Sequence, residues 1–190
     1  MNFGETLTYW YLRLNGFIPL RNFVLHRANI EGRTAADSDL LAVRFPHVYE
    51  EIGGRPNDWD NARFAAWRLN MAQNLAFIVE VKTGRIGPEI KGWRPERLRA
   101  ALLRLGMFEG ELVPEIAEEL EHASAIDVGS WSIVKLLVTK RPFREGYWLN
   151  LTLADADAFI ANRVAVYKAD KLADRLRFPD DLMQYLAWKS

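Results

Sequence analysis

The sequence contains no cysteine, has equal numbers of acidic and basic residues, and includes no long apolar run. Without cysteine, the chain cannot form a disulfide framework, a cysteine-ligated metal site or a thiol nucleophile. Its uncharged stretches, such as residues 69–79, fall short of the roughly 18 apolar residues that a membrane span requires. The first ten residues lack the basic and apolar regions of a secretory signal. We therefore expect a cytoplasmic protein that does not enter a membrane.

The overall composition of the chain is typical of a folded domain. Of the 190 residues, 49% are apolar and 12% are aromatic. A chain of this length buries about 70% of its unfolded surface, which is enough for one hydrophobic core. The formal net charge of zero removes the simplest indication of nucleic-acid binding, which is a strongly basic domain. Residues 1–190 are therefore expected to form a single domain, and any nucleic-acid site must come from local charge.

The charges are unevenly distributed along the chain. Residues 81–110 include seven basic and three acidic side chains, a net charge of +4. Residues 111–127 include six acidic side chains and no Lys or Arg, a net charge of −6. Such runs are usually the solvated faces of surface helices, and this is the simpler interpretation of both segments. A basic surface that contacts phosphates is the alternative for the first segment.

The pattern of apolar residues predicts an α/β fold. Helices are expected at residues 5–15, 62–74, 95–105, 114–123, 153–167 and 170–176, with a last helix after Pro179. Strands are expected at residues 22–27, 38–45, 76–82, 131–139 and 147–151. Because these strands are apolar on both faces, they predict one mixed central sheet flanked by helices. The core should comprise about residues 1–110 and 131–165, followed by a helical extension at about residues 166–190.

Three charged residues stand at the ends of two apolar strands. Asp39 lies near the start of one strand, and Glu80 and Lys82 lie at the end of another. Their two-residue spacing places Glu80 and Lys82 on the same face of their strand. Burying such charges is costly unless they are paired or bind a metal. They can form an ion pair at the rim of the sheet, or a Mg²⁺ site for phosphoryl transfer in which the lysine faces the attacking water.

Several segments of the N-terminal half resemble a known family. They are Glu5, YLRLNGF at residues 11–17, RN at residues 21–22, DSDLLAV at residues 37–43 and FIVEVKTG at residues 77–84. In this order and strand context the chain resembles the PD-(D/E)xK nuclease superfamily, and it is most similar to the small bacterial nuclease-like proteins and archaeal Holliday-junction resolvases of that superfamily. The resemblance implies a restriction-endonuclease-like core and metal-dependent cleavage of DNA.

The resemblance also implies roles for individual residues. Asp39 and Glu80 would ligate Mg²⁺, with Mn²⁺ as a substitute. Lys82 would position or activate water, and Glu5 would assist from the first helix, although an acid there also suits the helix dipole. The proline of the family motif is absent, and Asp37, on the same face as Asp39, could replace or support it as a ligand. A polar insertion of roughly 25 residues separates the two acidic strands.

The expected partner is a nucleic acid, which the resemblance identifies as DNA, and dimeric members of the superfamily imply a homodimer. Basic residues after the ExK strand are the expected phosphate contacts: Arg85, Lys91, Arg94, Arg97 and Arg104. Trp93 could stack on a base, although packing in the core is the simpler role. A second basic cluster comprises Lys135, Lys140, Arg141 and Arg144.

A second function stays open. Nuclease folds can serve as modules that bind nucleic acid or protein without cleaving, and the acidic residues 111–121 suit a contact with another protein. The presence of Asp39, Glu80 and Lys82 together favours cleavage, because a binding module has no need of a costly group of charges.

Overall fold

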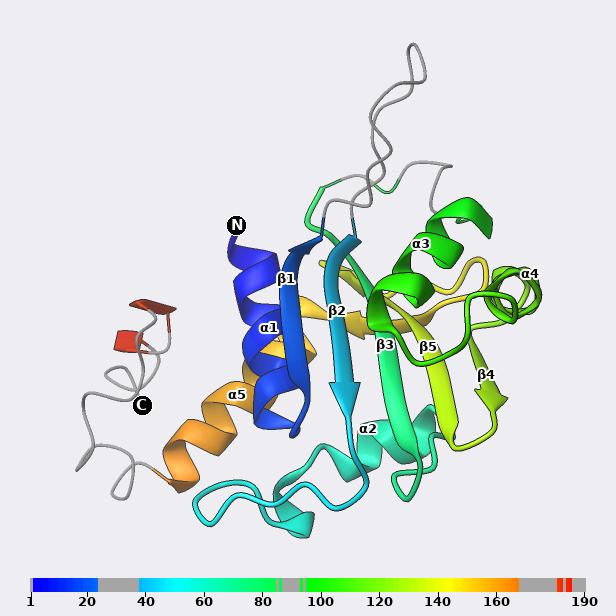
Figure 1. Ribbon diagram of the computed structural model, residues 1–190. Helices are drawn as coiled ribbons and strands as arrows, with labels where there is room; N and C mark the ends of the chain where they lie inside the picture. The colour runs from blue at the N-terminus through cyan, green and yellow to red at the C-terminus, as the bar shows by residue number, and fades with distance from the viewer. Residues whose placement is uncertain are drawn as a thin grey trace.

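The fold is organised around one six-stranded mixed β-sheet (Figure 1). The computed structural model describes residues 2–23, 38–84, 86, 93, 95–167, 181, 182, 184 and 185. The strands are β1 (Ile18–Phe23), β2 (Ser38–Arg44), β3 (Asn74–Lys82), β4 (Ala125–Val128), β5 (Trp131–Thr139) and β6 (Leu149–Thr152). Their order is β1-β2-β3-β5-β4, and β6 also pairs with β5. β2 pairs antiparallel with both β1 and β3, whereas β3 and β5 pair parallel.

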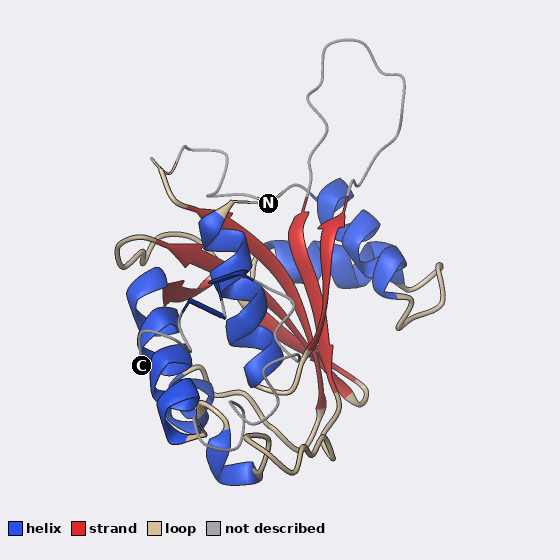
Figure 2. Ribbon diagram, turned by 90° about the vertical axis from the view of Figure 1, so that its left-hand side faces the viewer, coloured by secondary structure: helices blue, strands red, loops and turns tan. Residues whose placement is uncertain are grey.

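Helices cover both faces of this sheet (Figure 2). They are α1 (Phe3–Leu14), α2 (Asn61–Ala66), α3 (Pro95–Leu105), α4 (Val113–Glu121) and α5 (Leu153–Val166), with a short 3-10 helix, η1, at Pro56–Asp58. α1 and α5 pack together on one face, and α3 and α4 pack together on the other. The prediction of an α/β architecture with a mixed sheet flanked by helices is therefore confirmed.

Strand β3 contributes to the hydrophobic cores on both faces. Phe77 points to the face covered by α1 and α5, and Ile78 points to the face covered by α3 and α4. Successive side chains of a strand point to opposite faces, so a central strand covered on both faces is apolar throughout. The same alternation places Glu80 and Lys82 on the face of Ile78, beneath α3 and α4.

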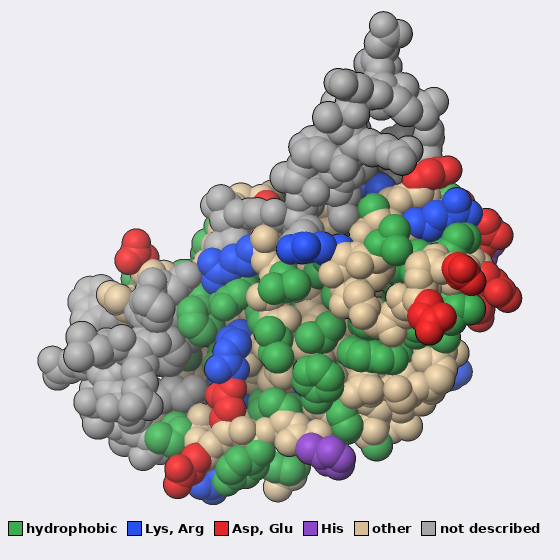
Figure 3. Space-filling view, in the orientation of Figure 1, with side chains coloured by type: hydrophobic (Ala, Val, Ile, Leu, Met, Phe, Trp, Pro, Cys, Tyr) green, Lys and Arg blue, Asp and Glu red, His purple; other side chains and the backbone are tan. Residues whose placement is uncertain are grey.

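The face that carries α3 and α4 is open over the first two strands (Figure 3). Leu20 lies opposite the buried Leu41 in the ladder between β1 and β2, so both side chains share this face. Ile18 and Leu20 are 56% and 42% exposed there. Lys and Arg side chains gather across the upper part of the same face, toward the edge where β2 begins and β3 ends.

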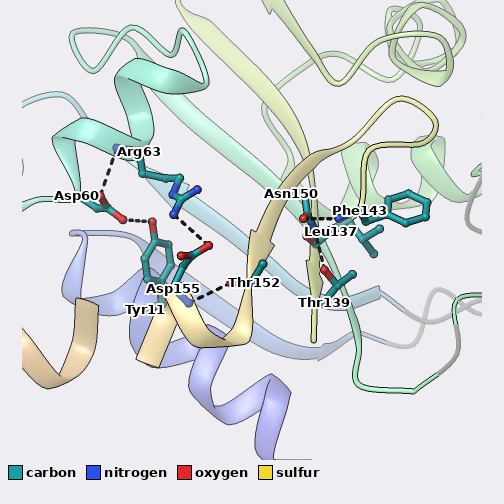
Figure 4. Close-up of polar contacts among 9 residues, drawn as sticks. All are labelled: Tyr11, Asp60, Arg63, Leu137, Thr139, Phe143, Asn150, Thr152 and Asp155. Atoms are coloured by element: carbon teal, nitrogen blue, oxygen red, sulfur yellow. Dashed lines mark hydrogen bonds and ion pairs between the residues drawn. The ribbon is translucent and has the colours of Figure 1, made fainter. Parts of the chain in front are cut away.

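The insertion between β2 and β3 is tied to the two helices of the opposite face. Asp60 caps α2 through the N–H of Arg63, and its other carboxylate oxygen accepts a hydrogen bond of 2.8 Å from the hydroxyl of Tyr11 in α1. Arg63 forms an ion pair of 3.1 Å with Asp155 at the start of α5. Figure 4 shows this series of contacts. The insertion therefore braces the helical layer formed by α1 and α5.

Two predicted elements have the wrong bounds. The first strand begins at Ile18 rather than at residue 22, because Gly16, with a φ of +79°, ends α1 and turns the chain directly into the strand. The helix predicted at residues 62–74 ends at Ala66, because Arg68, with a φ of +59°, leaves the helical backbone. Strand β4 is absent from the prediction, since its four residues are too few to form a periodic pattern.

Several predictions lie outside the described residues. They are the helix at residues 170–176, part of the last helix, the end of the first predicted strand, and the site residues Asp37, Arg85, Lys91 and Arg94. None of the helices in the described part of the chain is both long and apolar enough to cross a bilayer.

Candidate active site

One edge of the sheet brings together the ends of three strands. β3 and β5 are parallel and end at this edge, and the antiparallel β2 begins there. Leu40 lies opposite Val79, so the register continues with Asp39 opposite Glu80. Side chains opposite each other in an antiparallel pair lie on the same face. Asp39 and Glu80 therefore share the face covered by α3 and α4, and Lys82 lies on it two residues further along β3.

Asp39 is held by the main chain of β3. The N–H of Val81 donates a hydrogen bond of 2.6 Å to Oδ2 of Asp39. Burial, followed by the negative charge of Glu80, raises the pKa of Asp39 from 3.8 to about 6. The charge of Glu5 raises this pKa further, while the Val81 N–H and Lys82 oppose the shift. The carboxyl group is therefore ionised at neutral pH and becomes protonated below about pH 6.

Glu80 is a deeply buried charged group at this edge, with an exposed fraction of 3%. Nζ of Lys82 lies 2.5 Å from Oε1 of Glu80, and a guanidinium nitrogen of Arg97 lies 3.7 Å from Oε2. The second distance is too long for a hydrogen bond, and no described residue donates one to Oε2. A buried carboxylate oxygen without a donor is costly. A bound cation would remove that cost.

Lys82 connects the buried carboxylate with the solvent. Its side chain remains 32% exposed although its ammonium contacts Glu80. In the ladder between β3 and β5 it lies opposite Thr139, the last residue of β5. Its ammonium group can therefore interact both with Glu80 and with a molecule that approaches this edge.

Arg97 links the site to the core beneath α3. Its guanidinium stacks 4.2 Å from the ring centroid of Trp93, and Trp93 meets Trp148 edge to face at 5.4 Å. Trp93 is only 2% exposed. Trp93 is therefore a core residue, and the alternative in which its ring stacks on a base is wrong. The stack instead orients Arg97 toward Glu80.

Glu5 approaches from the other side of the sheet. α1 begins so close to the end of β3 that a Cβ on Gly4 would lie 2.7 Å from a methyl carbon of Thr83. The carboxylate of Glu5 accepts hydrogen bonds from the main-chain N–H of Asn2 at 3.2 Å and from its side-chain amide at 2.5 Å. The Glu5 oxygens therefore complete a capping box, while its charge still acts on Asp39.

The two carboxylates could serve as ligands of a Mg²⁺ ion that retains much of its water. Within the described ranges, no three His, Cys, Asp or Glu side chains form a metal-binding group. Mg²⁺ commonly takes only one or two protein carboxylates and completes its shell with water and substrate phosphates. Asp39 and Glu80 supply two carboxylates on one face, and Oε2 of Glu80 has no hydrogen-bond donor among the described residues. Lys82 and Arg97 neutralise Glu80 in the absence of a cation, so they would compete with the ion.

Two arginines of α3 are already engaged with carboxylates. Arg97 faces Glu80, and Arg99 forms an ion pair of 2.6 Å with Glu118 of α4. Arg104 is exposed in the last turn of α3. Of the five predicted phosphate contacts, the structure thus brings only Arg97 to the site, and three lie outside the described residues.

The sequence analysis missed a polar contact next to this edge. Nδ2 of Asn150 donates hydrogen bonds to the carbonyl oxygen of Leu137 at 2.8 Å and to Oγ1 of Thr139 at 2.9 Å. Oδ1 of Asn150 accepts a bond of 2.9 Å from the N–H of Phe143 (Figure 4). An asparagine inside an apolar strand is the signal in the sequence, but its partners depend on the parallel pairing of β5 with β6.

Comparison with protein-family models, curated proteins and solved structures finds no match to this chain. The assignment of a function therefore depends on the geometry of Asp39, Glu80 and Lys82.

Proposed function

We propose that the protein is a metal-dependent nuclease that hydrolyses phosphodiester bonds of DNA at the edge formed by β2 and β3. The meeting of Asp39, Glu80 and Lys82 on one face supports this most strongly, because one oxygen of Glu80 is buried without a hydrogen-bond donor among the described residues. An ion pair at the rim would account for Lys82 and Glu80. It would not account for a second carboxylate beside them whose pKa is raised to about 6, which is typical of functional sites.

The order of the elements supports a restriction-endonuclease-like core within this proposal. A helix, a hairpin and a strand follow one another as α1, β1, β2 and β3. Asp39 lies at the start of β2, and the Glu80-Val81-Lys82 motif lies at the end of β3. This is the arrangement that the resemblance to PD-(D/E)xK nucleases implies.

In the proposed reaction, Asp39 and Glu80 would hold Mg²⁺ through their carboxylate oxygens. When bound, such an ion would supply Lewis acidity and a water molecule of lowered pKa. Lys82 donates hydrogen bonds to the attacking water or to a phosphate oxygen, where it stabilises the charge that develops. The oxygen of water bonds to phosphorus, the bond from phosphorus to one sugar oxygen breaks, and the proton that the water loses passes through the solvent to that leaving oxygen. Arg97 compensates the charge of Glu80 when no cation is bound.

Cleavage of supercoiled plasmid tests this proposal. The wild-type protein should cleave in Mg²⁺ or Mn²⁺ and only bind in Ca²⁺. The Glu80→Gln variant should lose cleavage, whereas Glu119→Gln, a change at an exposed glutamate of α4, should retain it. Equal cleavage by the wild type and Glu80→Gln would indicate a contaminating nuclease or another site, and would contradict the proposal.

A binding module that does not cleave is the second candidate. The ion pairs of Glu80 with both Lys82 and Arg97 support it, because they compensate the buried charge without a metal. This candidate predicts DNA binding that is the same in Mg²⁺ and Ca²⁺, with no cleavage in either. The exposed Ile18 and Leu20 support a homodimer for both candidates, which light scattering would detect.

A further inference from the structure

We propose that the loop between β5 and β6, residues 140–148, binds the phosphate backbone of the nucleic acid beside the candidate active site. This inference rests on the proposed function, because it concerns the substrate of that site. The basic residues of segment 81–110 favour α3 as the main binding surface. We assign that surface to the loop instead.

The loop presents cations that are available to a ligand. Lys140, Arg141 and Arg144 are exposed, and none of them forms an ion pair with another described residue. By contrast, Arg97 and Arg99 of α3 are paired with Glu80 and Glu118. A cation paired with a carboxylate must first lose that partner before it can bind a phosphate. The loop therefore offers the stronger attraction for a polyanion.

The loop lies at the edge of the sheet where the proposed chemistry takes place. Lys82 is opposite Thr139 in the ladder, so Lys140 and Arg141 continue from the same edge. The other end of the loop reaches the site through the core, because Trp148 contacts the Trp93 ring on which Arg97 stacks. A strand whose phosphates follow this loop would thus arrive at Lys82.

The loop is fixed before any ligand binds. Asn150 joins it to β5 through three hydrogen bonds, which involve Phe143, Leu137 and Thr139 (Figure 4). Oγ1 of Thr139 also donates a bond of 2.6 Å to the carbonyl oxygen of Arg141. A binding surface that is already ordered loses less conformational entropy on association than a free loop.

The loop also contains aromatic side chains. Phe143 is half-buried and precedes Arg144, and Tyr147 is 49% exposed. Exposed cations and one exposed aromatic ring in the same loop suit a nucleic-acid strand, because the cations contact phosphates and the ring can stack on a base. The polyanionic backbone is common to duplex and single-stranded DNA, so both serve as probes.

Fluorescence anisotropy of labelled duplex and single-stranded oligonucleotides in Ca²⁺ tests the inference without requiring cleavage. The variant is Arg141→Gln/Arg144→Gln in the full chain. The control is Arg55→Gln/Arg68→Gln, which neutralises two exposed arginines of the insertion. Loss of two phosphate contacts should flatten the slope of log affinity against log salt by about 1.8 on duplex DNA or about 1.4 on a single strand. The control should leave the slope unchanged.

The outcomes separate this inference from the proposed nuclease activity. Unchanged slopes for Arg141→Gln/Arg144→Gln, or equal flattening by the control, would overturn the binding surface alone. A wild-type protein that binds through these arginines and never cleaves in Mg²⁺ would support the surface and contradict the nuclease. If the wild type binds neither oligonucleotide, the surface is overturned whatever the plasmid assay gives.

Discussion

Lys82 and Glu80 form an ion pair within a single strand, with Nζ of Lys82 2.5 Å from Oε1 of Glu80. The pair occupies the end of β3, beside Asp39 at the start of β2. It leaves Oε2 of Glu80 facing Arg97 at 3.7 Å, beyond hydrogen-bond distance. In the proposed site, one strand end therefore supplies both a metal ligand and a cation for the phosphate, and substitutions of the two residues should have different effects.

Replacement of Lys82 by alanine should separate catalysis from metal binding. We expect cleavage to slow by about 100-fold to 1000-fold, because the variant lacks a group that stabilises charge in the transition state. The affinity for Mn²⁺ should stay the same or increase, because a cation that competes for Glu80 is gone. Single-turnover cleavage and calorimetric titration measure the two effects. Loss of Mn²⁺ binding would contradict this separation, because it would mean that Lys82 holds the carboxylates in the arrangement that binds the metal. The control is Arg68→Ala, which removes an exposed cation elsewhere.

The affinity for Mn²⁺ should depend on pH through Asp39. Since burial raises the pKa of Asp39 to about 6, protons compete with the metal below that pH. We expect the affinity to be nearly constant from pH 7 to 8 and to fall by about tenfold for each unit below 6. Calorimetry from pH 5 to pH 8 measures this profile. A flat profile down to pH 5 would show that Asp39 is not a ligand.

The free energy of unfolding should respond to the same titration. The pKa of Asp39 is higher in the folded protein, so the folded state loses stability as pH rises from about 3.8 through about 6, and the loss is complete above that range. The Asp39→Asn variant should thus be more stable than the wild type at pH 8, by about 1–2 kcal/mol after allowance for partial solvent exposure. The difference should vanish near pH 4. Urea unfolding at both pH values tests this, and a variant less stable at pH 8 would contradict it.

Asn150 should matter for stability more than its half-buried position in the short strand β6 suggests. The Asn150→Ala variant would leave the N–H of Phe143 and the carbonyl of Leu137 without their partner, which costs about 1–3 kcal/mol. Asn61→Ala removes one exposed hydrogen bond to the carbonyl of Pro56 and should cost about 0.5 kcal/mol or less. Denaturant titration compares the two variants, and equal losses would refute a special role for Asn150.

The elements that the sequence predicts well are those with a strong local pattern. The run FIVEVK identifies β3, and the two-residue spacing of Glu80 and Lys82 fixes their common face. The position of Asp39 opposite Glu80 follows once β2 and β3 are assumed to pair antiparallel. This part of the candidate site could therefore be derived from residues alone.

Other features depend on contacts between distant parts of the chain. Trp93 has the same local context whether it stacks on a base or packs inside, and only its contact with Trp148 decides between these roles. Likewise, Arg97 meets Glu80 because α3 crosses the face of β3. The role of Glu5 cannot be predicted from the sequence for a different reason. An acid in a first helical turn serves a capping box and a catalytic site equally well.

The most direct test of the central claim is a crystal soaked in Mn²⁺ and measured at a wavelength where manganese scatters anomalously. We predict an anomalous peak between the carboxylates of Asp39 and Glu80, with metal–oxygen distances of about 2.0–2.3 Å and with Lys82 displaced from Oε1 of Glu80. The peak should disappear in Glu80→Gln crystals treated in the same way. Well-ordered density for both carboxylates with Lys82 still bound to Glu80, and no manganese between them, would contradict the proposed metal site.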